Sequence, residues 1–183
     1  MHLTHLDNLS NKLKSHPLRK KTLIAATGDH SLRRVKAYLP QELALDRAVP
    51  FYLYVPPEVQ QHTELKYAPL RVGSHKDIFP TLFSYSLSNT EYLALGGRNL
   101  LARTDDTSYA FGYNSTLWIH DSGVYPLNVN GRKYAWKDKR SLYVLEKSFP
   151  VEKKQQEKIF AYPALLRWHT NAMVKGTIEN PVQ

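Results

Sequence analysis

Residues 24–30 read Ile-Ala-Ala-Thr-Gly-Asp-His, an apolar run that ends at a Thr-Gly turn with an adjacent carboxylate and imidazole. A continuous apolar run is typical of a strand buried on both faces of a parallel sheet. Ligands of open α/β sheets bind just beyond the carboxyl ends of such strands. The run therefore predicts a parallel core strand, with Asp29 and His30 as candidate metal ligands. An alternative stays open, because Asp29 would also suit the N-terminus of a helix that follows.

The composition is that of a globular domain. The chain has 183 residues, of which 42% are hydrophobic and 22% are charged, and these values are ordinary for folded proteins. Its sequence has neither the eighteen or so consecutive apolar residues of a membrane helix nor the apolar core of a signal peptide. We therefore expect the chain itself to be soluble. Cysteine is absent, which excludes disulfides, thiol nucleophiles and iron–sulfur clusters.

The net charge of +9 favours an anionic partner. Nucleic acid, phospholipid head groups and phosphate-bearing substrates all satisfy this preference. The basic residues are scattered, however, and neither a helix-turn-helix nor an RNP-type aromatic motif accompanies them. We therefore do not expect a nucleic-acid partner.

We expect a single structural unit of the α/β class, because neither repeats nor a long flexible linker divides the chain. Residues 1–101 form its α/β part, and residues 102–183 form an antiparallel meander followed by a terminal helix. Apolar periodicity predicts the elements of the first part. They are a helix over 3–13, strands over 22–26 and 48–55, a short helix that ends near Pro40, and a helix over 76–87.

The second part shows a different pattern. Short strand-like pieces alternate with turn signals over 109–145, and Asn130-Gly131 is a strong hairpin signal. This spacing predicts a small antiparallel meander. Residues 152–174 then predict a helix that packs on the sheet.

Four segments within residues 3–101 together resemble one family. They are Ala26-Thr-Gly-Asp-His30, Val49-Pro-Phe-Tyr-Leu-Tyr54, Ser74-His-Lys-Asp-Ile-Phe-Pro-Thr-Leu-Phe83 and Gly97-Arg-Asn-Leu-Leu101. In this order they are similar to the C-terminal half of sulfatase-like enzymes of the alkaline phosphatase superfamily, near lipoteichoic acid synthases and related phosphoglycerol or phosphoethanolamine transferases. The resemblance implies a sulfatase-like core sheet with helices on both faces.

The resemblance also implies a metal site. In that family an Asp-His pair after a core strand binds a catalytic divalent cation, and by position this pair is Asp29 and His30. A carboxylate oxygen and a neutral imidazole nitrogen suit manganese, zinc or magnesium to differing degrees. The guanidinium groups of Arg33 and Arg34 would bind an anionic substrate, although a solvated helix face explains them equally well.

Family members also have an N-terminal half with an acidic metal ligand and a Thr, Ser or modified Cys nucleophile, and the sequence shows neither. We therefore expect a C-terminal fragment of a metal-dependent transferase or sulfatase-like hydrolase that is inactive alone. Its parent would be held in the inner membrane with the catalytic domain facing the periplasm or the cell exterior. Its substrate would be an anionic phospholipid head group or another phosphate or sulfate ester, and its partner the missing half or another subunit.

The alternative is a noncatalytic basic module that binds anionic lipid or a partner protein. The other histidines that we considered are weaker candidates for a functional site. His75 and Asp77 are interpreted as capping or surface residues at a helix start, and His120 and His169 as structural residues. A Ser-based hydrolase is excluded because no Gly-x-Ser-x-Gly motif occurs.

Overall fold

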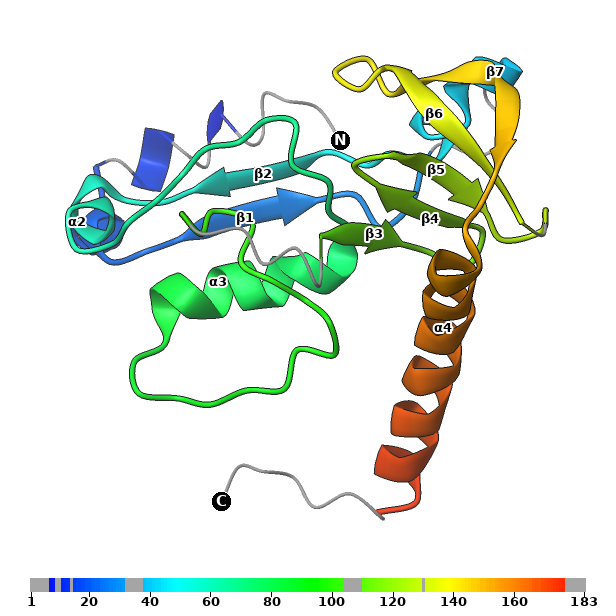
Figure 1. The fold of residues 1–183 in the computed structure, drawn as a ribbon. Coiled ribbons are helices and arrows are strands. Elements are labelled where there is room, and N and C mark those ends of the chain that lie inside the picture. Colours follow the sequence, from blue (N-terminus) through cyan, green and yellow to red (C-terminus); the bar gives the residue numbers. More distant parts are fainter. Residues whose placement is uncertain are drawn as a thin grey trace.

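The computed structural model describes residues 7–8, 11–13, 15–31, 38–103, 110–129 and 131–176. This part has a mixed α/β architecture with a two-stranded sheet, a five-stranded sheet and a long C-terminal helix (Figure 1). The helical elements are η1 (Pro17–Lys20), η2 (Pro40–Glu42), η3 (Leu45–Arg47), α2 (Pro57–Gln60), η4 (His75–Asp77), α3 (Ile78–Ser86) and α4 (Lys153–Val174). The strands are β1 (Ile24–Thr27), β2 (Phe51–Tyr54), β3 (Phe111–Tyr113), β4 (Leu117–His120), β5 (Gly123–Pro126), β6 (Arg132–Asp138) and β7 (Tyr143–Pro150).

Strands form near residues 22–26 and 48–55 as predicted, but the prediction that the first is a parallel core strand is wrong. β1 and β2 pair antiparallel, with Ile24 opposite Tyr54 and Thr27 opposite Phe51. Neither strand contains a fully buried residue, because the pair has few neighbours and the alanines of β1 offer little apolar area to bury. A short apolar run does not specify the direction of its partner strand. The sulfatase-like core sheet therefore stays a prediction.

The other predicted elements agree better with the structure. The helix predicted over 76–87 is confirmed by η4 and α3, and the meander by the consecutive antiparallel order of β3 to β7. The helix predicted over 152–174 is confirmed by α4. Residues 7–8 and 11–13 of the helix predicted over 3–13 are helical. The short helix predicted before Pro40 falls largely on residues 32–37, which lie outside the described residues.

The five-stranded sheet buries a different cluster on each face. Trp118, Phe111 and Tyr125 pack against Ile159 and Tyr162 of α4. The rings of Phe111 and Trp118 stack with centroids 3.9 Å apart, and burying each such side chain stabilises the fold by roughly 1.5–3 kcal/mol. The opposite face buries another cluster, formed by Ala44, Leu117, Val124 and Val144.

Beyond its contact with the sheet, α4 extends away from the body of the molecule (Figure 1). Within the described ranges, no helix combines the length and apolar character needed to cross a bilayer. The part of α4 that carries Ile159 and Tyr162 packs against the five-stranded sheet, which confirms the predicted packing of this helix.

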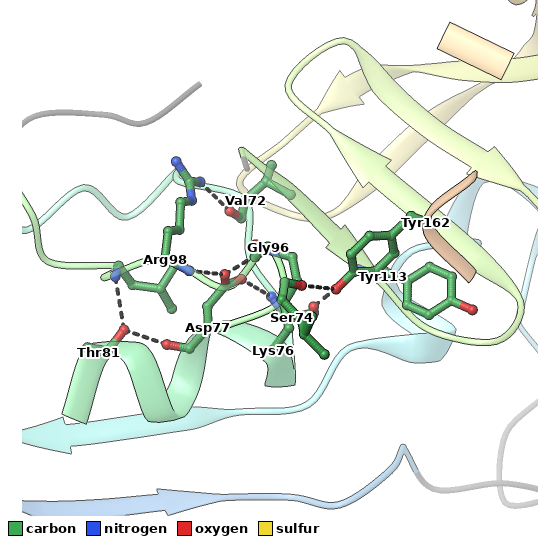
Figure 2. A network of polar contacts seen from close by, with 11 residues as sticks. Val72, Ser74, Lys76, Asp77, Thr81, Gly96, Arg98, Tyr113 and Tyr162 are labelled. Atoms are coloured by element: carbon green, nitrogen blue, oxygen red, sulfur yellow. Dashed lines mark hydrogen bonds and ion pairs between the residues drawn. The ribbon is translucent and has the colours of Figure 1, made fainter. Parts of the chain in front are cut away.

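The buried carboxylate of Asp77 joins separate segments of the chain (Figure 2). This side chain is fully buried. One carboxylate oxygen accepts from the backbone N–H of Ser74 at 2.9 Å, and the other accepts from the backbone N–H of Arg98 at 3.0 Å. The Lys76 ammonium also donates to it at 2.6 Å. A buried charge is tolerated when it is paired and hydrogen-bonded in this way.

The same network includes Thr81 and Lys76. The Thr81 hydroxyl donates to the backbone carbonyl of Asp77 at 2.6 Å and accepts from the Leu100 N–H at 2.9 Å. Lys76 also donates to the Gly96 carbonyl at 2.9 Å. Burial lowers the pKa of Lys76, and the negative charge of Asp77 opposes this shift.

We expect Asp77→Ala to lower the free energy of unfolding by about 3–5 kcal/mol, because it leaves the Lys76 ammonium buried without its counter-charge. Urea denaturation of the wild type and the variant measures this loss. Asp46→Ala is the control, since Asp46 pairs with Arg47 at 3.1 Å near the surface and should cost less than about 1 kcal/mol. Equal losses in the two variants would contradict a central role for the buried carboxylate.

Tyr162 makes the stability sensitive to alkaline pH. Its hydroxyl donates to the Leu95 carbonyl at 2.9 Å, and burial, with the negative charge of Asp77 next in size, raises the pKa of Tyr162 to about 12. An unfolded tyrosine has a pKa of about 10. The folded state therefore holds this proton more tightly, and its stabilising contribution is complete below pH 10 and is lost as the pH rises towards 12.

Thermal unfolding between pH 8 and 12 tests this effect. We expect the Tm to fall through the upper part of this range in the wild type. Tyr162→Phe should show a shallower fall, because it has no phenol proton to lose. Parallel curves for the two proteins would show that another group causes the alkaline loss.

Candidate metal centre

The turn after β1 brings the two predicted metal ligands together. Gly28, Asp29 and His30 follow the last residue of the strand, and the two ionisable side chains are 88% and 59% exposed, respectively. His30 Nε2 lies 3.5 Å from Asp29 Oδ2. The other carboxylate oxygen of Asp29 accepts from the His30 backbone N–H at 2.9 Å, which orients the carboxylate on the turn.

The second ring nitrogen of His30 determines which tautomer the neutral ring adopts. Nδ1 lies 2.8 Å from the Ser31 carbonyl oxygen. Because a carbonyl only accepts, Nδ1 carries the proton, and Nε2 of the neutral ring is left as an acceptor 3.5 Å from Asp29 Oδ2. Two acceptors this close repel unless a proton or a cation lies between them. Metal-bound histidines have the same arrangement, with the second nitrogen donating to a carbonyl or carboxylate.

The pair also has the spacing of a chelate. Zinc binds histidine nitrogen and carboxylate oxygen at about 2.0–2.2 Å, which places two tetrahedral ligands about 3.4 Å apart. The observed separation of 3.5 Å between His30 Nε2 and Asp29 Oδ2 fits this value. In the part of the chain that the structure describes, no group of three or more His, Cys, Asp or Glu side chains could hold a metal. Among the described residues the turn therefore offers the two candidate donors of Asp29 and His30, and the metal site stays a prediction.

Other predicted candidates do not add to this pair. Arg33 and Arg34 lie outside the described residues, as does most of the helix that Asp29 would cap. His120 Nδ1 lies 3.3 Å from the Ser122 hydroxyl, and burial lowers the pKa of His120. His169 is buried on α4.

His75 is the residue whose role the sequence did not reveal. Its Nε2 lies 2.8 Å from the carbonyl oxygen of Gly28, the residue before Asp29. Because the carbonyl accepts, Nε2 of His75 is the donor. His75 is also the first residue of η4, two positions before Asp77. It therefore ties the turn to the buried network, a contact between residues 47 positions apart that local sequence cannot indicate.

A cavity of approximately 310 Å³ opens beside this turn. Thr27 and His75 line it on the side of the turn, and its wall is largely apolar, with Phe51, Ile78 and Leu100 among its members. Cationic side chains also belong to the lining, namely those of Arg47, Arg71 and Lys139. The volume lies within the range of small-molecule sites. Arg47 and Lys139 pair with Asp46 and Asp121, and Arg71 donates to the carbonyls of Leu100 and Ala102.

Comparison with known proteins does not place the chain in a family. No family model matches it, and neither the curated proteins nor the solved structures contain a significant match. The resemblance of the four segments to sulfatase-like enzymes therefore stays a prediction. The fold and the site define a mixed α/β protein with an exposed Asp-His pair at the end of a strand.

We expect His75→Leu to weaken the predicted divalent-cation binding at the turn about tenfold, because it removes the hydrogen bond that fixes the backbone before Asp29 and His30. His75→Gln should retain most of the affinity, because its amide nitrogen replaces the donor at Nε2. Titration with Mn²⁺ measures this difference, and amide hydrogen exchange at residues 28–30 reports the order of the turn without metal. Identical behaviour of the Leu and Gln variants would contradict the assigned role.

Proposed function

We propose that this chain forms part of a metal-dependent site for phosphoryl or sulfuryl transfer, in which Asp29 and His30 bind a divalent cation. The observation that carries the proposal is the chelating geometry, with His30 Nε2 3.5 Å from Asp29 Oδ2 and the second ring nitrogen held by a carbonyl. The resemblance of the surrounding segments to sulfatase-like transferases supports the same chemistry. Manganese, zinc and magnesium are the candidate cations.

The residues around the pair suit an anionic ester. A bound cation would polarise a phosphoryl or sulfuryl oxygen. Asp29 would balance part of the cation's charge, and His75 would hold the turn in place through the Gly28 carbonyl. The neighbouring cavity, with Arg47, Arg71 and Lys139 in its lining, would receive the rest of the substrate. A phospholipid head group or another phosphate or sulfate ester is the substrate class that we propose.

Coordination chemistry limits what two donors can do. Zinc takes four ligands and magnesium takes six, so other protein groups would have to complete a tight site and supply the nucleophile. We propose that these groups come from a further segment, either the N-terminal half of a sulfatase-like domain or another subunit. The complete enzyme would work at the inner membrane, facing the periplasm or the cell exterior.

Calorimetric titration with Mn²⁺ and Zn²⁺ tests the metal site. We expect weak binding by the wild type and an affinity about tenfold lower in Asp29→Ala, because one of two donors is removed. Asp121→Ala is a matched control, since Asp121 also adjoins a histidine but pairs with Lys139. The proposal fails if the wild type binds neither ion, or if Asp29→Ala binds as the wild type does.

Activity provides a second readout for the same variants. With Mn²⁺ present, we expect no turnover of a phosphodiester or an aryl sulfate above the buffer rate, because we propose that the nucleophile and further ligands come from another segment. Turnover at an enzyme-like rate that Asp29→Ala abolishes would contradict the requirement for a further segment while retaining the metal site.

A further inference from the structure

The side of α4 that faces solvent has a row of apolar residues from Phe160 to Trp168, with the exposed Arg167 beside it. Phe160 is 51% exposed, Leu165 is 46% exposed and Trp168 is 62% exposed. Ala161 and Ala164 lie between them and are also exposed. Positions 160, 164 and 168 follow one another at four-residue spacing and therefore share one face of the helix. Positions 161 and 165 form the adjacent row. We call these five residues the outer stripe.

The outer stripe is not needed for the core, because the opposite side of α4 already packs on the sheet. Ile159 and Tyr162 belong to the aromatic cluster, and Leu166 packs against that cluster. A helix that is apolar on both sides is normally covered on both sides. Figure 1 shows α4 projecting beyond the sheet, and the exposure of Phe160, Leu165 and Trp168 leaves the outer stripe accessible to a large partner. A contiguous exposed apolar surface of this kind marks an interaction site.

Charge indicates which partner suits the outer stripe. The segment from 152 to 176 has five basic side chains and two acidic ones, a net charge of +3. The basic residues are Lys153, Lys154, Lys158, Arg167 and Lys175, and the acidic residues are Glu152 and Glu157. A second copy of the helix would bring like charges together, which is unfavourable. A nucleic acid would match the charge but would not bury the leucine and alanine side chains.

We propose that the outer stripe of α4 binds the surface of an anionic membrane. The rings of Trp168 and Phe160 would enter the interfacial layer, which aromatic side chains favour. The lysine and arginine stems would lie along it with their charged ends at the lipid phosphates. Apolar burial provides the affinity, and the net positive charge provides the preference for anionic lipid. This surface uses neither Asp29 nor His30, so it is independent of the proposed metal site.

Vesicle binding in EDTA tests this surface without any contribution from bound metal. The probes are phosphatidylcholine vesicles with and without phosphatidylglycerol. We expect the wild type to sediment with the anionic vesicles and its tryptophan emission to shift to shorter wavelength. A Phe160→Ser/Trp168→Ser double variant should bind about tenfold more weakly. Lys153→Gln combined with Lys154→Gln should also weaken binding, and added salt should do the same.

Two controls distinguish binding by the outer stripe from nonspecific binding by other exposed aromatic side chains. Tyr67→Ser removes a large side chain that is 81% exposed elsewhere, and it should bind vesicles as the wild type does. Trp168→Phe should retain sedimentation but lose most of the emission shift, since Trp118 is buried in the core and Trp136 lies on β6 with its indole N–H bonded to the His120 carbonyl. Circular dichroism of each variant confirms that α4 is intact.

Three results would overturn the proposal. The first is equal binding of the double variant and the wild type to anionic vesicles. The second is equal binding of the wild type to neutral and anionic vesicles. The third is a lipid-free dimer, detected by light scattering and lost in the double variant, which would assign the outer stripe to a second copy of the chain.

Discussion

The carboxylate of Asp77 is the contact on which the arrangement around the candidate site depends. It is fully buried, and it is compensated by two backbone N–H groups and the Lys76 ammonium. Because an uncompensated charge in this position would cost several kcal/mol, the loop before η4 and the loop around Arg98 must both approach it. The Ser74 hydroxyl extends this network to the meander by accepting from the Tyr113 N–H at 3.1 Å.

The hydrogen-bonded network around Asp77 supports the turn after β1, and this turn is itself open to solvent. β1 has one strand partner among the described residues and contains no buried side chain. The hydrogen bond from His75 to Gly28 therefore provides its direct polar connection to the buried network. The proposed cation would bind at side chains that are oriented by local hydrogen bonds and remain exposed to solvent.

Much of the second half of the chain could be predicted from sequence because its information is local. The Asn130-Gly131 signal and the alternating strands predict consecutive hairpins, and each hairpin pairs neighbours in the chain. The helix over 152–174 likewise follows from its own periodicity. The pairing of β1 with β2 could not be predicted, since an apolar run such as 24–27 is compatible with either direction of its neighbour.

For the candidate site too, some features follow from the sequence and others only from the tertiary structure. The sequence by itself determined that a carboxylate and an imidazole are adjacent, and adjacent residues on a turn can chelate because the covalent chain keeps them close. The tertiary structure decided that His30 Nε2 lies 3.5 Å from Asp29 Oδ2, that His75 anchors the turn and that a cavity lies beside it. These features depend on contacts between segments distant in the chain or on backbone geometry, and neither is encoded in the spacing of a motif.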